Sequence, residues 1–283
     1  MTLIDSIDFV LNGICVVLWL NWCAVGIAQP VVGSGISLLT TLKRAETRRI
    51  NRWVSLAALS GILILRAAFY WLFGFEFAWT FLIDLGPIAI PFRADYFGRV
   101  ALYSVTSFGL FLGVFYSSLL LLSILNKRTG ENDYLCRLLR LHLRGVESSP
   151  AFIKLLLPVV GAGILWMLFA PLLRMWGMVP PWVSWRCLWE QAVVFGVMAL
   201  LTWRYALVLI LLLYLIQSYV YLGNHYSWSF LNLTAKNILR PLENRSIQLG
   251  KFDLRPAIGI VVILGFSACI RWAMVEIYQR LPI

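Results

Sequence analysis

Charged residues are scarce in this sequence: they make up 13 % of its 283 residues, whereas 61 % are apolar. A soluble domain has about 25 % charged and about 45–50 % apolar residues. A chain of this size has no core large enough to bury such an apolar excess. The composition therefore excludes a soluble enzyme, a disordered protein and a secreted disulfide scaffold, and it predicts an integral membrane protein.

Cysteine and histidine are sparse too, and their spacing indicates no site. The sequence has no CxxC pair, so neither a disulfide framework nor a zinc site is indicated. It also has no HExxH, GxSxG or P-loop motif and no pair of carboxylates within an apolar run. We therefore expect no enzymatic activity, no cofactor and no metal. The two histidines, His142 and His225, fall in connectors at unrelated positions, which disfavours a bis-histidine haem site.

Long apolar runs are what the sequence does have. Six of them could cross a bilayer, which takes about 20 helical residues. The fifth is longer than a span requires, which predicts tilt or a continuation into the interface. The runs lack the alternating polar positions of a membrane β-barrel. We therefore predict an all-α polytopic protein with spans at 7–29, 53–74, 98–125, 152–175, 190–222 and 256–278.

The spans are expected to form three helical hairpins, covering residues 1–97, 98–178 and 179–283. The formal net charge of +11 indicates membrane orientation here rather than nucleic acid as a partner. Most Lys and Arg residues lie in the connectors after the first, third and fifth spans, which the positive-inside rule places in the cytoplasm. Both termini should therefore face outward, and the short acidic start indicates a bacterial cytoplasmic membrane. Connector cations that are candidates for contact with anionic lipids are Lys43, Arg44, Arg48, Arg49, Arg137 and Arg140.

The second and third of these connectors share a plan. Each has a basic amphipathic stretch, then a polar break, then a Pro-x-x-Gly sequence at the mouth of the next span. The prolines are Pro158 and Pro256, and the glycines are Gly161 and Gly259. Proline suits the first turn of a helix, where its missing N–H has no acceptor within the helix. Two related hairpins are therefore predicted.

The last hairpin resembles the repeat of the YggT family of small integral membrane proteins, also called YlmG. The residues that carry the resemblance are Arg240-Pro241, then Gly250, Asp253 and Pro256 at the spacing of the family motif. Lys251 and Arg255 replace a glycine and a serine of that motif. The 126–175 segment is a more distant relative that keeps Arg144 and Pro158.

What the resemblance implies is an accessory role. Members of the family have no established enzymatic activity, and plastid relatives are connected with haem attachment during cytochrome assembly. The resemblance thus implies a scaffold or assembly protein with other membrane subunits as partners.

The motif residues also have a physical interpretation. Gly250 permits a tight turn, and Asp253 is placed to cap the helix that enters the membrane. Arg240 and Arg255 would then lie at the level of the lipid phosphates. Two interpretations stay open: a helix cap with snorkelling arginines, or a surface that docks a partner or anionic lipids.

Arg66 and Arg204 lie within apolar runs, where an arginine is costly and usually has a partner or a water path. One interpretation is that both snorkel to the outer headgroups. The other is a buried charge pair, for which Glu76, Asp84 and Glu190 are the candidate partners on the same predicted side.

The segment 75–97 is too broken by glycine and proline to span, yet very apolar. It is predicted as an outer loop that forms an aromatic belt or, alternatively, a partner interface. Together these features favour a non-enzymatic accessory or scaffold protein, in contact with lipids and other membrane subunits. The alternative is a small-solute or ion transporter or channel that uses the intramembrane arginines.

Overall fold

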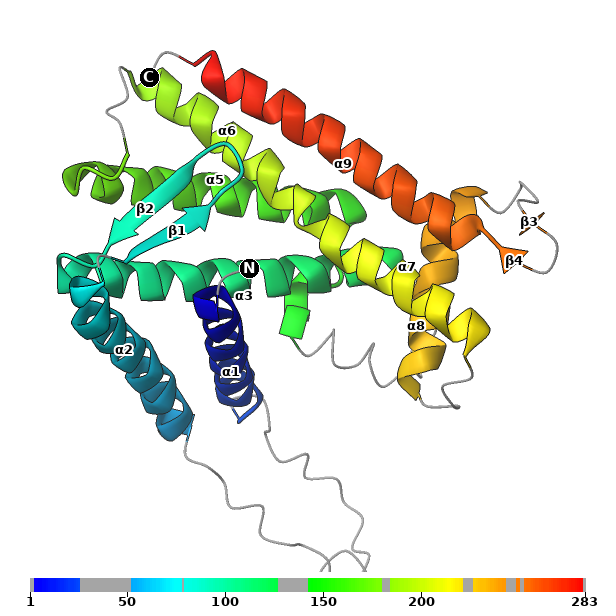
Figure 1. The fold of residues 1–283 in the computed structure, drawn as a ribbon. Coiled ribbons are helices and arrows are strands. Elements are labelled where there is room, and N and C mark those ends of the chain that lie inside the picture. The colour runs from blue at the N-terminus through cyan, green and yellow to red at the C-terminus, as the bar shows by residue number, and fades with distance from the viewer. Residues whose placement is uncertain are drawn as a thin grey trace, which may run out of the picture. The chain divides into compact units, whose positions relative to one another are not determined.

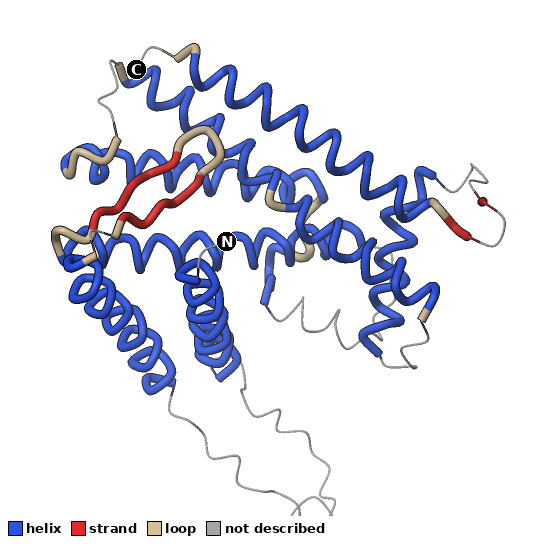
Figure 2. Tube along the Cα trace, viewed as in Figure 1, coloured by secondary structure: helices blue, strands red, loops and turns tan. Residues whose placement is uncertain are grey.

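The structure is a computed structural model, and it describes residues 3–25, 52–77, 79–126, 142–179, 184–220, 226–242, 248–249 and 252–281. Helices dominate this part of the chain, as the apolar runs predict (Figures 1 and 2). Six helical segments among the described residues are long and apolar enough to cross a membrane. The chain is therefore an all-α, multi-pass membrane protein.

Five of these segments are single helices with bounds close to the predicted runs. They are α1 (Leu3–Val25), α2 (Arg52–Glu76), α3 (Phe97–Leu125), α5 (Ala151–Met175) and α9 (Arg255–Gln279). The largest difference is at the N-terminus, where α1 begins at Leu3 rather than at residue 7. The helix includes Asp5 and Ser6, which the hydropathy pattern alone assigns to a tail.

The remaining segment divides into α6 (Trp185–Leu201) and α7 (Trp203–Tyr219). Thr202 lies between them, and its hydroxyl donates a hydrogen bond to the carbonyl oxygen of Ala199 at 2.7 Å. Back-bonding of this kind bends helices. The excess length of the fifth apolar run is thus accompanied by a helix break, which the sequence prediction did not include.

The chain separates into two compact units. The first comprises Met1–Phe81 and Phe92–Leu112, and the second comprises Leu82–Pro91 and Gly113–Ile283. The boundary therefore falls within α3. The three hairpins proposed from the sequence stay a prediction.

In the first unit, α1 and α2 run antiparallel and are joined by polar side chains near both ends. Asn21 of α1 donates to the hydroxyl of Ser55 in α2 at 2.9 Å. Towards the other end, the hydroxyl of Tyr70 in α2 donates to the carboxylate of Asp8 in α1 at 2.7 Å. Polar contacts thus fix the register of this helix pair along its length.

In the second unit, α5 and α6 pack closely through glycine. A Cβ atom at Gly196 of α6 would lie 2.5 Å from the carbonyl oxygen of Val159 in α5. One at Gly163 of α5 would lie 3.1 Å from the carbonyl oxygen of Ala192. Membrane helices approach closely where small residues face a neighbour. These glycines therefore determine the distance between the two spans.

α8 (Tyr226–Leu239), with the 3-10 turn η2 (Arg240–Leu242), belongs to the third basic connector. It is amphipathic, and its apolar face packs on the protein. Ala235 and Leu239 are buried with Leu211 of α7, and a Cβ at Gly259 of α9 would touch Leu239 at 3.0 Å. The spans of the same chain therefore cover the apolar face of α8.

Polar groups attach α8 to the C-terminal end of α3. Asn126 donates to the hydroxyl of Thr234 at 3.0 Å, and Asn237 donates to the carbonyl oxygen of Leu125 at 3.0 Å. The last carbonyl groups of a helix have no partner within it. Asn237 supplies one of those missing partners, so α8 acts as a cap on α3.

The segment predicted as an apolar outer loop contains a β-hairpin, which the sequence prediction missed. Strands β1 (Thr80–Asp84) and β2 (Ala89–Arg93) pair through a turn at Gly86-Pro87. Gly86 has φ +98°, a conformation that glycine adopts at the first central position of such turns. Buried and exposed residues alternate along both strands; the buried ones are Phe81, Ile83, Ile90 and Phe92.

Candidate functional site

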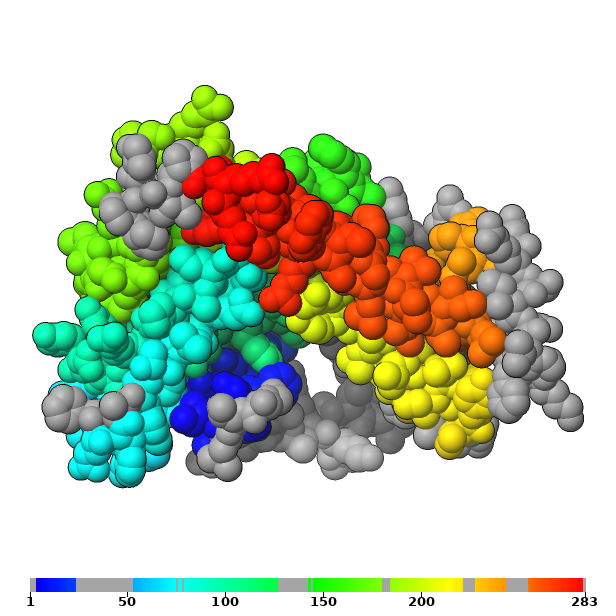
Figure 3. All heavy atoms as spheres, turned by 45° about the horizontal axis from the view of Figure 1, so that its top comes forward, coloured from blue at the N-terminus to red at the C-terminus, as the bar shows by residue number. Residues whose placement is uncertain are grey.

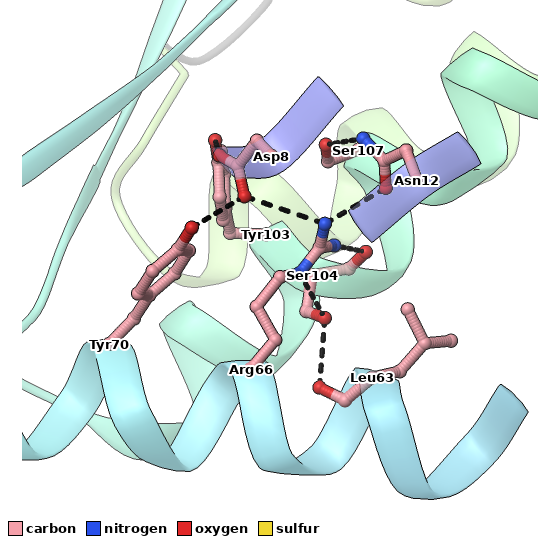
Figure 4. A network of polar contacts seen from close by, with 8 residues as sticks. All are labelled: Asp8, Asn12, Leu63, Arg66, Tyr70, Tyr103, Ser104 and Ser107. Atoms are coloured by element: carbon pink, nitrogen blue, oxygen red, sulfur yellow. Dashed lines mark hydrogen bonds and ion pairs between the residues drawn. The ribbon is translucent and has the colours of Figure 1, made fainter. Parts of the chain in front are cut away.

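The richest polar network among the described residues lies in the first unit and centres on Arg66 of α2 (Figure 4). The central residue of α2 is Ile64, and Arg66 lies about 3 Å from it along the helix axis. It lies deep within the span, and it is 4 % exposed. An arginine at this depth is costly unless it is paired, so its partners determine its role.

The guanidinium of Arg66 is bound at all three nitrogen atoms. Nε donates to Oγ of Ser104 at 3.0 Å, and Nη2 donates to the carbonyl oxygen of the same residue. Nη1 donates to Oδ1 of Asn12 at 2.8 Å and lies 3.5 Å from Oδ1 of Asp8. One side chain of α2 is thereby bound to both α1 and α3.

The carboxylate of Asp8 is bound at both oxygen atoms. The hydroxyl of Tyr70 donates to Oδ1 at 2.7 Å, and the hydroxyl of Tyr103 donates to Oδ2 at 2.5 Å. Hydrogen bonds to an ionised acceptor are short and about twice as strong as neutral ones. Together with Arg66, these tyrosines compensate the buried charge of Asp8.

A second layer of contacts fixes the orientation of the first. The hydroxyl of Ser104 accepts from Arg66 and donates to the carbonyl oxygen of Leu63 at 2.9 Å. Asn12 accepts from Arg66 and donates to the hydroxyl of Ser107 at 3.0 Å. Because the donors and acceptors alternate along these chains, each side chain has one favourable orientation.

Aromatic rings close one side of the network. The ring of Phe81 stacks on Tyr70 with centroids 4.7 Å apart and on Tyr103 with centroids 4.9 Å apart. Phe92 lies 5.6 Å from Tyr103. These rings exclude water from the two phenols, and electrostatic interactions strengthen as the local dielectric constant falls.

The arrangement is suited to attachment rather than to catalysis. Each nitrogen atom of the guanidinium and each oxygen atom of the carboxylate has a partner within the first unit. A solute or a transferred proton would therefore have to displace an existing contact. What the network does in this state is to join α1, α2 and α3.

The sequence located Arg66 within a span but did not identify its partner. The prediction that Arg66 snorkels is wrong, because the side chain is buried. Glu76, Asp84 and Glu190 are also wrong as partners, since the partner is Asp8, at the start of the first predicted span. The available signal was spacing: Asp8 and Asn12 are four residues apart on α1, as are Arg66 and Tyr70 on α2, and such pairs share a helix face.

Arg204 differs from Arg66. It is half-buried near the start of α7, donates to the hydroxyl of Tyr205 at 2.7 Å, and lies 4.7 Å from the centroid of that ring. Of its predicted partners, Glu190 pairs with Arg186 and Asp84 pairs with Arg271. An aromatic neighbour thus takes the place expected for an acidic one.

A second buried cation lies in the second unit. Lys154 of α5 is 2 % exposed, and its Nζ donates to the hydroxyl of Ser123 near the C-terminal end of α3 at 2.8 Å. A cation is favourable at this end of a helix, where the helix dipole is negative. Lys154 therefore joins α5 to α3 in the same way as Arg66 joins the helices of the first unit.

The predicted helix-entry motif is partly described. α9 begins at Arg255, and Pro256 is its buried second residue, so the first-turn prediction is confirmed for Pro256. The N-cap of α9 is Leu254, which makes no side-chain cap bond, so the predicted cap residue Asp253 lies one position before the N-cap. The side chain of Asp253 and the whole of Gly250 lie outside the described residues.

The other motif residues are dispersed. Arg240 and Pro241 are exposed in η2, and Arg144 begins the 3-10 turn η1 (Arg144–Val146) with its side chain outside the described residues. The first-turn prediction is wrong for Pro158. The N-cap of α5 is Pro150, in an extended conformation, so the helix is already formed where Pro158 occurs.

The connector residues predicted to contact anionic lipids lie outside the described residues; they are Lys43, Arg44, Arg48, Arg49, Arg137 and Arg140. His225 lies outside them as well. His142 is half-buried, and burial lowers its pKa below the usual value for histidine. Its imidazole is therefore neutral near pH 7.

Comparison of the chain with family models, with curated proteins and with solved structures finds no match. The resemblance to the YggT family therefore stays a prediction that depends on the motif residues quoted above. The class of protein follows from the fold: a multi-pass α-helical membrane protein with a buried ionic network between its first three spans.

Proposed function

We propose that this chain is a non-enzymatic accessory or scaffold protein of a larger membrane complex or of its assembly. The observation that supports the proposal most is the closed Arg66–Asp8 network. A transport pathway needs polar groups that exchange partners with a solute, whereas the groups of this network are bound to one another. A fixed arrangement of helices is what a scaffold presents to its partners.

The proposal places the chain in the bacterial cytoplasmic membrane, with both termini outside and the basic connectors in the cytoplasm. Support for this orientation comes from the distribution of Lys and Arg along the sequence. Anionic lipids of the cytoplasmic leaflet are then partners of the connectors, as each cation near such a surface contributes about 1 kcal/mol. The accessory role agrees with what the resemblance to the YggT family implies.

A second candidate is a small-solute or ion transporter or channel. The observation that favours it is an ion pair in the second unit between Asp84 and Arg271, whose side chains are 66 % and 45 % exposed. A charged pair that is open on one side is more accessible to solutes than the Arg66–Asp8 network.

The two candidates are distinguished by native mass spectrometry of the tagged full chain, extracted gently from its own membrane. The scaffold proposal expects the chain in a fixed ratio with the same membrane subunits in repeated preparations. Arg204→Leu is the control variant. The side chain of Arg204 lies outside the network, so the ratio of the chain to the other subunits should persist. Recovery of the chain alone, or only with copies of itself and lipid, would overturn the proposal and make flux measurements in proteoliposomes the next step.

A further inference from the structure

The turn of the β1–β2 hairpin contacts two spans of the second unit. Oδ2 of Asp84 lies 3.8 Å from Nη2 of Arg271 in α9, and Oδ1 accepts a hydrogen bond from the backbone of Gly86 at 2.7 Å. A side chain at Gly86 would collide with the end of Met198 in α6. In Figure 3 the atoms of the hairpin (cyan) lie against those of α9 (orange to red).

These contacts occur well inside the spans. α9 runs antiparallel to α6 and α7, since Gly259 meets Leu211 and the ring of Tyr278 lies 5.8 Å from that of Phe195. Arg271 lies about 12 Å along the axis from Gln279, the C-terminal residue of α9. The helix is about 37 Å long, and the hydrocarbon core is about 30 Å thick. Arg271 therefore lies about 8 Å inside the hydrocarbon region, and the hairpin turn lies beside it.

A hairpin cannot face lipid at this depth. Within the described residues the sheet has only these two strands, so the outer N–H and C=O groups of each strand have no sheet partner there. Each such group costs several kcal/mol in hydrocarbon. Irregular backbone is tolerated within a membrane only where protein buries it or water reaches it. Asp84 and Arg271 are not covered, since their side chains are 66 % and 45 % exposed.

We propose that the β1–β2 hairpin is a re-entrant element and that water and small hydrophilic ions reach its turn and the Asp84–Arg271 pair from the outer side of the membrane. Water then solvates the open hairpin edges and the exposed halves of both charges. The inference goes beyond the proposed function, because it assigns a water-accessible polar site within the spans of the second unit.

Thiol accessibility tests the proposal in the full-length protein. Ile88 lies next to the turn, accepts a hydrogen bond from the backbone of Leu85 at 3.0 Å and is half-buried, so Ile88→Cys introduces a thiol beside the turn that carries Asp84. The purified variant in proteoliposomes is treated with a charged, membrane-impermeant methanethiosulfonate, and the labelled sites are read by peptide mass spectrometry. The thiol introduced by Ile88→Cys is expected to react at least tenfold faster than a lipid-facing thiol at the same depth.

The chain provides that control itself. Cys269 is exposed and lies two residues before Arg271, on a different face of α9. Leu82→Cys gives a second variant on the exposed side of β1, in case Ile88→Cys alters the turn. Equally slow labelling of Cys269 and of both introduced thiols would overturn the proposal, because it would show that water does not reach the hairpin.

Discussion

Arg66 in the second span and Asp8 in the first form an ion pair whose side chains are 1 % and 9 % exposed, with Nη1 3.5 Å from Oδ1. The two residues are far apart in the sequence, and each lies in a helix that is mainly apolar. A buried pair of this kind contributes little against a well-packed apolar alternative, but removing one partner leaves an uncompensated charge. The pair therefore makes the arrangement of α1, α2 and α3 sensitive to single substitutions.

Arg66→Leu should destabilise the protein by about 3–5 kcal/mol, the cost of breaking a buried pair from one side. The substitution leaves the Asp8 carboxylate in the span with the hydroxyl groups of Tyr70 and Tyr103 as its donors among the described residues. The measurement is the thermal transition of the detergent-solubilised protein, followed by size-exclusion chromatography after heating. Arg204→Leu is the control, because that half-buried arginine bonds only to Tyr205 among the contacts described above. Equal losses of stability for the two variants would contradict the assignment of a structural role to Arg66.

Tyr103→Phe removes one hydrogen bond to the Asp8 carboxylate and keeps the ring that stacks on Phe81. The expected loss is about 1.5–3 kcal/mol, as for other hydrogen bonds to charged groups. Tyr70→Phe should behave in the same way. The same heating assay measures both variants, with Tyr96→Phe as the control because Tyr96 is 66 % exposed. If neither variant differs from that control, the two phenols do not stabilise Asp8.

Gly196→Ala tests the close contact of α5 and α6. The added methyl group would lie 2.5 Å from the carbonyl oxygen of Val159, a backbone atom that cannot move without displacing the helix. We expect a loss of about 1–3 kcal/mol from overpacking. Gly161→Ala is the matched control, since a Cβ at Gly161 has no described atom within 4 Å, and helix propensity favours alanine by about 1 kcal/mol. Thermal stability is expected to fall in Gly196→Ala and to rise in Gly161→Ala. A Gly196→Ala variant as stable as the unchanged protein would exclude a tight interface.

The spans could be predicted from the sequence because a long apolar run has few alternatives to a membrane helix. The break at Thr202 could not be predicted. A threonine side chain can bond to the carbonyl oxygen three residues before it in a continuous helix as well as at a break, as Thr202 does to Ala199. The hairpin was missed for a related reason. Gly86 and Pro87 identify a turn, but the apolar residues around them are as typical of an interfacial loop as of a strand, and only their alternating burial decides between the two.

The candidate site was half predicted. Arg66 is evident as a charge in an apolar run, but its partner lies in a helix whose pairing the sequence does not specify. Asp8 and Glu76 both lie near the predicted outer side, and hydropathy gives no reason to prefer one of them. Packing decides: α1 lies against α2 in a register that brings Asp8 and Asn12 to Arg66, whereas Glu76 ends its helix in an exposed position.

Asn126→Ala should loosen α8 without unfolding the spans. Asn126 donates to the hydroxyl of Thr234 at 3.0 Å and accepts from Asn237 at 3.3 Å, so it holds two positions of α8 on the end of α3. Loss of these bonds costs about 1–3 kcal/mol, and each 1.4 kcal/mol corresponds to a tenfold change in an equilibrium. Amide hydrogen exchange within α8 should therefore accelerate by about 5-fold to 100-fold, while exchange in α5 and α6 stays unchanged. Ser118→Ala is the control, because its hydroxyl donates within α3 to the carbonyl oxygen of Val114 at 2.8 Å. Uniform acceleration in all helices would instead mean that α8 and the spans open together, as one cooperative unit held by Asn126.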